Sequence, residues 1–385
     1  MKASNGKMYG MTSLGGIHNE GVLFSFNPAT DVLDTLHSLT GNSNTGPSGN
    51  VIQGPNGKLY GMTQRGGSHG LGVIYSYDTT AGTYADLFSF DGTATSGNSP
   101  YGSLLLANDG NMYGMCYEGG NGGGYGALFR FNPNTNVYTN MFGFDYFHGE
   151  YPYGSLIQAA NGKLYGTVQQ GGSIGQGVIF SYNIPDSTLT TLHSFITSDG
   201  SQPNADLVEV SGILYGMTTL GGAYGKGMLF SIDTAGTTFD TLMSFDGAAH
   251  GSSPHGSLLP FNGKLYGMTT EGGTYTGGVI FAWDIALGQF DTLRNMNITT
   301  DGNYPYYSSF ILVNDNATAV NNPVAMASGI TVYPNPASTT LNIHSQLTID
   351  NSQLIITDVL GNEVYHEMLL SNVNYQLSIV NCQLE

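Results

Sequence analysis

The chain has 385 residues with 57 glycines, only 9% charged residues and a net charge of −18. A chain this acidic repels the phosphates of nucleic acid and the headgroups of anionic lipid. The composition therefore argues against both kinds of partner. The length suggests two or three ordinary domains, and no stretch is apolar enough for long enough to span a membrane.

A Tyr-Gly pair followed four residues later by a Gly-Gly pair occurs six times, the first copy starting at residue 9. Consecutive copies are 50 to 53 residues apart. A fixed period of this size marks stacked supersecondary units such as propeller blades. The sequence therefore predicts a six-bladed β-propeller. The repeated tyrosines are Tyr9, Tyr60, Tyr113, Tyr165, Tyr215 and Tyr266.

Each repeat is predicted to form four strands, as the unit at residues 100–152 illustrates. PYGSLLL at 100–106 is the expected innermost strand, and NDG at 108–110 a hairpin turn. NMYGMC at 111–116 is the second strand, and a glycine-rich hairpin leads from it to ALFRF at 127–131, which alternates with period two. Residues 138–144 are the outer strand. Four short strands per repeat are typical of a blade, and almost no helix is expected.

The first copy begins just before its second strand, so its blade lacks an innermost strand. At the far end, YPYYSSFILV at 304–313 resembles an innermost strand with no blade after it. We expect residues 310–313 to pair beside residues 7–11, which completes the sixth blade and removes an exposed edge. Because the first residues match the interior of a repeat, the start is interpreted as processed or truncated.

The expected domains are the propeller at 1–313, a linker at 314–328 and a small β-sandwich-like unit at 329–385. The repeat GKLYGMT, then GG, then GV(L/I)FS resembles the Gloeo/Verruco-type tandem repeat of bacterial surface proteins. This resemblance implies export and attachment to the cell surface, and it implies no catalytic residues.

The last segment carries VYPNPAS at 332–338, LNI at 341–343 and LIITDVLGNEV at 354–364. These runs resemble the start and middle strands of the type IX secretion C-terminal sorting domain. The resemblance implies a small β-sandwich, the type IX secretion machinery as partner, and a location outside or on the outer membrane of a Gram-negative bacterium. After YQLSI at 375–379 the usual Gly-Tyr turn and closing strands do not follow, so the end is interpreted as truncated.

Motifs for chemistry are missing. No HxH or HExxH spacing signals zinc, no GxSxG elbow appears, and no Lys-Ser or Lys-Thr completes a phosphate loop. His37 and His193 occupy a repeat position that elsewhere holds Phe, Met or Arg, which indicates a packing or surface site. No cofactor is predicted, and Ca²⁺ is the weaker alternative because no Asp-x-Asp cage appears.

Topology gives a better indication of a site. In a four-stranded meander the Gly-Gly hairpins and the proline-containing loops between blades lie on one face of the ring. The residues after the loop prolines should surround the central channel, with the aspartates of Asp-Gly pairs just upstream. Aromatic, amide and carboxylate side chains around one concavity suit hydroxyl-rich ligands, although all of them can equally be turn and packing residues. The candidates are Tyr101, Tyr153, Asn204, His255 and Tyr306, with Ser48 at the same position, and Asp91, Asp199, Asp246 and Asp301.

Three functions remain open at this point. The first is a secreted, monomeric surface module that binds a glycan or a surface protein. The second is an extracellular carbohydrate hydrolase or lyase that uses loop carboxylates, since glycoside hydrolysis needs two carboxylates across a cleft. The third is a purely structural surface module.

Overall fold

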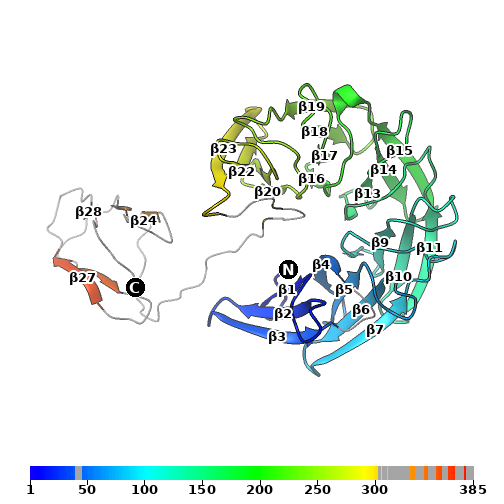
Figure 1. The fold of residues 1–385 in the computed structure, drawn as a ribbon, viewed down its shortest axis with the longest axis horizontal. Coiled ribbons are helices and arrows are strands. Elements are labelled where there is room, and N and C mark those ends of the chain that lie inside the picture. Colours follow the sequence, from blue (N-terminus) through cyan, green and yellow to red (C-terminus); the bar gives the residue numbers. More distant parts are fainter. Residues whose placement is uncertain are drawn as a thin grey trace. The chain divides into compact units, whose positions relative to one another are not determined.

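The computed structural model describes residues 1–39, 46–301, 305 and 310, and five strands between residues 330 and 378. Two compact units divide the chain, Met1–Ala317 and Thr318–Glu385. The first is a six-bladed β-propeller, whose sheets are arranged around a common centre (Figure 1). Within the described residues, five blades have four antiparallel strands and the first has three. The predicted all-β propeller is therefore confirmed.

In each blade the strands follow one another from the centre to the rim (Figure 1). The innermost strands are β4 (Pro47–Gln53), β8 (Leu105–Leu106), β12 (Ile157–Gln158), β16 (Val208–Val210) and β20 (Leu259–Phe261). The second strands, which carry the repeated tyrosine, are β1 (Met8–Thr12), β5 (Leu59–Thr63), β9 (Met112–Cys116), β13 (Leu164–Val168), β17 (Ile213–Thr218) and β21 (Lys264–Met268).

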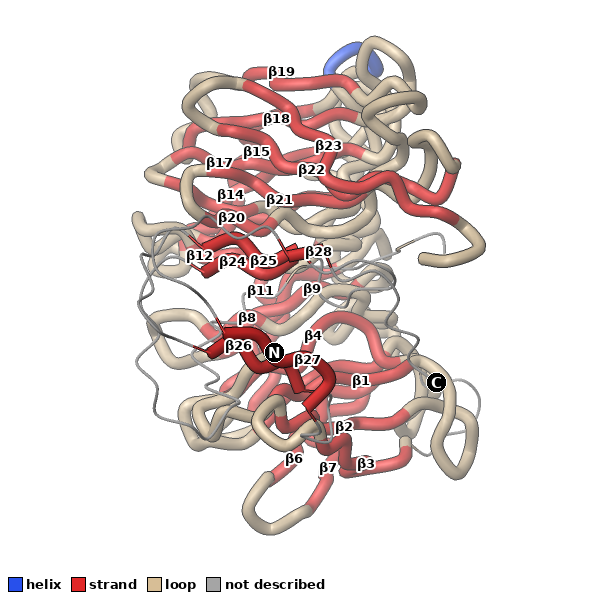
Figure 2. Tube along the Cα trace, turned by 90° about the vertical axis from the view of Figure 1, so that its left-hand side faces the viewer, coloured by secondary structure: helices blue, strands red, loops and turns tan. Residues whose placement is uncertain are grey.

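The second and third strands are the most deeply buried, and the outer strands form the rim. The third strands are β2 (Val22–Asn27), β6 (Val73–Asp78), β10 (Ala127–Asn132), β14 (Val178–Asn183), β18 (Met228–Asp233) and β22 (Thr276–Asp284). The outer strands are β3 (Val32–Ser38), β7 (Thr83–Ser89), β11 (Val137–Gly143), β15 (Thr188–Ser194), β19 (Phe239–Ser244) and β23 (Gln289–Asn297). One 3-10 turn, η1 (Thr197–Asp199), is the only helix in the described chain (Figure 2).

Four of the five described innermost strands, all except β4, are shorter than predicted. In the third blade only Leu105–Leu106 pairs as a strand, whereas the prediction extended it back to residue 100. The reason is that residues before β8 use their backbone donors elsewhere: the N–H of Ser103 bonds the side-chain oxygen of Ser155 in the next blade at 2.9 Å. The missing ladder is thus replaced by contacts between blades.

The Tyr-Gly pair is a packing unit. Gly114 on β9 lies opposite Phe129 on β10, and a Cβ at Gly114 would stand 2.5 Å from the Cζ of that ring. The glycine therefore makes room for the aromatic ring on the neighbouring strand. The tyrosine before it is buried, and in the fourth blade the Tyr165 hydroxyl accepts a bond from Asn161 at 2.7 Å and donates to the Thr234 carbonyl at 2.9 Å. The repeated tyrosine thus fixes its own hairpin and reaches the next blade.

Adjacent blades also stack through the ends of their outer strands. Phe88 lies on Tyr138 with ring centroids 4.1 Å apart, and His193 lies on Phe239 at 3.8 Å, both pairs within 3° of parallel. His37 stacks in the same way on Tyr84 at 4.0 Å. Of the two roles expected for this position, packing or surface, these two histidines have the packing role.

His193 makes the packing between blades sensitive to acid. Burial against Phe239 lowers the pKa of His193 below its ordinary 6.5, while Asp199 at 3.2 Å acts in the opposite direction. A lowered folded-state pKa gives stability that is complete above 6.5 and is lost as the pH falls toward the folded-state value. We expect His193→Phe, which copies Phe88 and Phe142 at the equivalent positions, to lessen the fall in melting temperature between neutral and mildly acidic pH. A fall as steep as that of the parent chain would contradict this role.

Two predictions fall partly or wholly outside the described residues. Apart from Phe310, the segment expected to complete the first blade is not among them, and neither are the domain boundaries at 313 and 328. Both stay predictions. The second unit has an antiparallel sheet of β24 (Ile330–Tyr333), β25 (Asn342–Ser345) and β28 (Leu377–Ser378), and a hairpin of β26 (Gln353–Thr357) and β27 (Glu363–Met368).

Candidate functional site

The proline loops are held between the hairpins of two blades. In the loop before β12, the N–H of Glu150 bonds the carbonyl of Gln170 at 2.8 Å, and the N–H of Tyr151 bonds the carbonyl of Tyr125 in the preceding blade at 2.8 Å. The residue before the proline adopts a left-handed backbone, which L-residues rarely do, at Ser99, Tyr151, Gln202 and Ser253 (φ 51° to 60°). These repeated contacts place the proline loops and the Gly-Gly hairpins on one face, as predicted.

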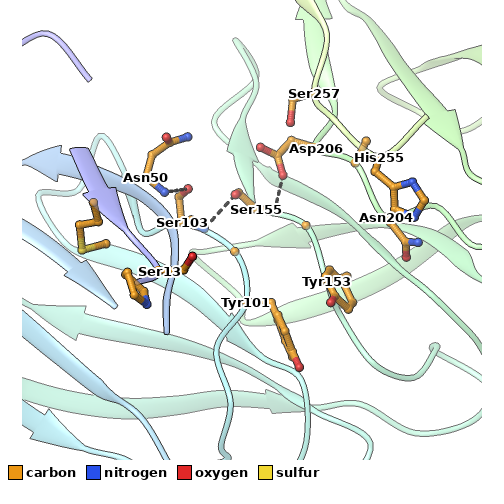
Figure 3. Close-up of a pocket in the computed structure, with 16 residues that line it drawn as sticks. Ser13, Asn50, Tyr101, Ser103, Tyr153, Ser155, Asn204, Asp206, His255 and Ser257 are labelled. Atoms are coloured by element: carbon orange, nitrogen blue, oxygen red, sulfur yellow. Dashed lines mark hydrogen bonds between the residues drawn. The ribbon is translucent and has the colours of Figure 1, made fainter. Parts of the chain in front are cut away.

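A cavity of about 260 Å³ opens among these loops. Its lining comes from all six blades, so it lies at the centre of the ring (Figure 3). The structure brings together four of the predicted residues here, Tyr101, Tyr153, Asn204 and His255. Tyr306 is outside the described residues, and so is the side chain of Ser48. The other lining residues are Met11, Ser13, Pro47, Gly49, Asn50, Gly102, Ser103, Gly154, Ser155, Ala205, Asp206 and Ser257.

A chain of hydrogen bonds runs round the cavity from blade to blade (Figure 3). The N–H of Asn50 donates to the Ser103 hydroxyl at 2.7 Å, and the N–H of Ser103 donates to the Ser155 hydroxyl at 2.9 Å. The N–H of Ser155 donates to Oδ1 of Asp206 at 2.5 Å. Each side chain therefore binds the backbone of the preceding blade and also lines the cavity.

These residues were missed in the sequence. All of them stand three positions after the loop proline, so the signal was present as a repeated offset. A small hydroxyl side chain in a Pro-Tyr-Gly-Ser turn is easily taken for turn chemistry alone. The distinguishing feature is Asp206, a carboxylate where the two preceding blades and the following one have serine.

Tyrosines cluster on one side of the cavity. Tyr101 and Tyr153 come from neighbouring blades and stack with centroids 4.4 Å apart and planes 25° from parallel. Tyr117 meets both edge-on, and it stacks in turn on Tyr151 at 4.9 Å. The result is a packed aromatic wall beside the polar chain of serines and Asp206.

Asn204 and His255 line another side of the cavity (Figure 3). Asn204 is 6% exposed; its Nδ2 donates to the Thr219 hydroxyl at 3.1 Å, and its Oδ1 has no hydrogen-bond partner. His255 donates from Nδ1 to the Ser253 carbonyl at 2.9 Å, since a carbonyl can only accept. Burial lowers the pKa of His255, so a neutral ring is favoured near neutral pH.

The four predicted aspartates do not line this cavity. Each accepts hydrogen bonds within its own loop. Bonds from the Ser96 hydroxyl and from Thr93 lower the pKa of Asp91 to about 2, and a bond from Arg294 does the same for Asp301. Asp246 holds the backbone and ring of His250, and Asp199 accepts the N–H of Ile196. In the structure these aspartates stabilise turns, which was the alternative interpretation of the sequence.

Within the described part of the chain, no three His, Cys, Asp or Glu side chains gather into a group that could hold a metal ion. No helix in that part is both long enough and apolar enough to cross a membrane.

The comparisons with known families cover nearly the whole chain. The model of the Gloeobacter/Verrucomicrobia repeat matches residues 1–221 and 154–318. The model of the secretion system C-terminal sorting domain matches residues 331–383. A propeller followed by such a sorting domain makes this a protein exported to the cell surface or beyond it. No curated protein matches the chain.

Solved structures share the fold at low sequence identity. The extracellular domain of a candidate hybrid two component system from B. thetaiotaomicron is 14% identical with a TM-score of 0.53; the match covers 78% of this chain and 33% of that one. A candidate 6-phosphogluconolactonase from Bacteroides fragilis is also 14% identical with a TM-score of 0.53, and 95% of each chain is covered. The chain thus spans about a third of the first of these proteins, and both likenesses concern the fold alone.

Proposed function

The chain belongs to the Gloeobacter/Verrucomicrobia repeat family, and from this premise we propose that its propeller is an exported binding module whose central cavity holds a carbohydrate. The observation that carries the proposal is the composition of the cavity wall. An aromatic side of Tyr101 and Tyr153 faces a space whose other sides are hydroxyl, amide and carboxylate groups. Sugar rings offer apolar C–H faces for stacking and hydroxyls for hydrogen bonds, so both kinds of wall have a partner.

The size of the cavity fits this class. A volume of about 260 Å³ lies just below the usual range for small-molecule sites, which favours one or two sugar rings over a protein loop. The tyrosines are held by stacking and the serines by hydrogen bonds between blades. A wall that is already ordered loses little conformational entropy on binding.

Catalysis is the less supported alternative. Among the described lining residues Asp206 is the only carboxylate, whereas glycoside hydrolysis needs two. The same residues include no Lys or Arg, so a phosphorylated sugar, which the name of the Bacteroides fragilis protein suggests for that protein, would lack a charge partner here. Binding without chemistry needs neither feature.

A glycan array probed with the full chain tests the proposal. We expect binding to a defined set of sugars, and we expect Tyr101→Ala and Tyr153→Ala each to weaken it about tenfold, because stacking area is lost. Phe261→Ala, which removes a part-exposed aromatic ring in the β20–β21 hairpin, should leave the affinity unchanged. Titration calorimetry measures the affinities, and thermal melting checks that each variant is folded. An array without binding, or sugars bound equally well by both tyrosine variants, would contradict the proposal.

A further inference from the structure

We propose that the cavity selects an amine-bearing sugar and that Asp206 is the counter-ion of its ammonium group. This inference rests on the proposed carbohydrate function and names the class of sugar. It starts from an exception in the repeat. Three positions after the loop proline stand Ser103, Ser155 and Ser257 in three blades, but Asp206 in the fifth.

The carboxylate is not required for the contact between blades. Oδ1 of Asp206 accepts the N–H of Ser155, and the hydroxyl of Ser155 accepts the N–H of Ser103 in the same way. Serine therefore satisfies this position in the preceding blade. The aspartate adds a negative charge and a second oxygen at the cavity, and no Lys or Arg of the described chain forms a salt bridge with it.

Other side chains that line the same cavity as Asp206 also favour a positively charged ligand. Asn204, two residues earlier in the same loop, is 6% exposed and its Oδ1 has no hydrogen-bond partner. A buried acceptor without a donor is costly, and a ligand N–H group would remove that cost. Tyr101 and Tyr153 line the same cavity, and an aromatic ring attracts a cation to its face. A carboxylate, an amide oxygen and aromatic rings together favour an ammonium group and disfavour a uronic acid.

The rest of the cavity argues for a sugar amine over a simple amine. The hydroxyls of Ser103 and Ser155 each accept a backbone N–H, which leaves their own protons to donate to a ligand oxygen. A hydroxyl-rich ring supplies such oxygens beside its amine. A peptide lysine supplies the charge on a flexible chain but no oxygens at the same place.

The test uses two variants that each exchange one acid for the residue of the preceding blade. Asp206→Ser copies Ser155, and its hydroxyl can still accept the Ser155 N–H. Glu209→Gln is the control at the other end of the same inner segment: Glu209 accepts the N–H of Ala160 at 2.9 Å, as Gln158 accepts that of Asn108 at 2.8 Å. Both variants lose one negative charge, so only the position of the charge differs between them.

Titration calorimetry of the full chain compares glucosamine oligosaccharides with N-acetylglucosamine oligosaccharides of equal length, at a pH where the amines are charged. We expect the parent chain and Glu209→Gln to bind the amine form about tenfold more tightly, as a charge-assisted hydrogen bond allows. Asp206→Ser should lose this preference and keep its affinity for the acetylated form.

Other outcomes separate this inference from the proposed function. Equal affinity for both sugars, or a preference that persists in Asp206→Ser, overturns the amine selectivity while carbohydrate binding stands. Lysine oligomers that bind as tightly as the amino sugar overturn the assignment to a sugar. If neither oligosaccharide nor any other glycan binds, the proposed function fails as well.

Discussion

Replacing Phe230 with alanine is expected to lower the free energy of unfolding by about 3–5 kcal/mol, as for other large-to-small changes in a packed core. Phe230 on β18 is fully buried, and its ring covers Gly216 on the neighbouring strand. It also contacts Phe195 and Phe239, with ring centroids 5.4 and 5.6 Å away. The same core includes Tyr165 of the preceding blade, so the cavity left by the mutation would weaken contacts both within and between blades.

Urea denaturation followed by tyrosine fluorescence and circular dichroism measures this loss. Phe147→Ala is the control. Phe147 is 77% exposed, so this substitution removes the same chemical group from the surface instead of the core. Its cost should stay within about 0.5 kcal/mol. Similar costs for the two variants would show that the third-strand aromatic rings do not form the core.

A second large effect is expected at the Gly-Gly pairs. Gly221 has φ +78°, and a Cβ there would stand 2.6 Å from the backbone carbonyl carbon of Gly200 in the adjacent loop. Alanine at this position is destabilising for two reasons. The left-handed backbone costs about 1 kcal/mol, and the steric clash with the main chain, which cannot move away as a side chain could, costs about 1–3 kcal/mol. We expect Gly221→Ala to cost about 3 kcal/mol.

Gly212 separates the two penalties. It has a similar φ of +83°, but a Cβ would meet nothing within 4 Å. Gly212→Ala should therefore cost only about 1 kcal/mol in the same denaturation experiment. If the two alanine variants lose equal stability, the close approach of hairpin and loop does not matter, and the Gly-Gly pair serves the turn alone.

The architecture could be predicted because the residues that define it recur. The Tyr-Gly pair recurs in all six blades, and an aromatic residue on the third strand follows the tyrosine by 15 residues in five of them and by 16 in the blade of Tyr113. Each of these positions has one physical role that tolerates few alternatives. The extent of the innermost strands could not be predicted in the same way. Whether Ser103 continues a ladder or donates to Ser155 depends on a partner about 50 residues away, which no local pattern reveals.

The site was predicted in part. Meander topology alone identified the face of the ring and brought Tyr101, Tyr153, Asn204 and His255 to one cavity. The aspartates were selected for their chemistry, but short polar side chains also bond their own turn, and Asp91 and Asp246 do so. Asp206 was overlooked for the opposite reason, because it occupies a position where serine is the usual residue.

The exception at Asp206 also has a geometric consequence. Six similar blades give the face of the ring a rotational near-symmetry, so a ligand on the axis would find several almost equivalent directions in which to point. Six equal orientations would leave the bound ligand about 1 kcal/mol of orientational entropy but no defined direction. A single carboxylate on the circle distinguishes one direction from the other five. The carboxylate thereby fixes how a ligand is rotated about the axis of the propeller, although the blades are near copies of one another.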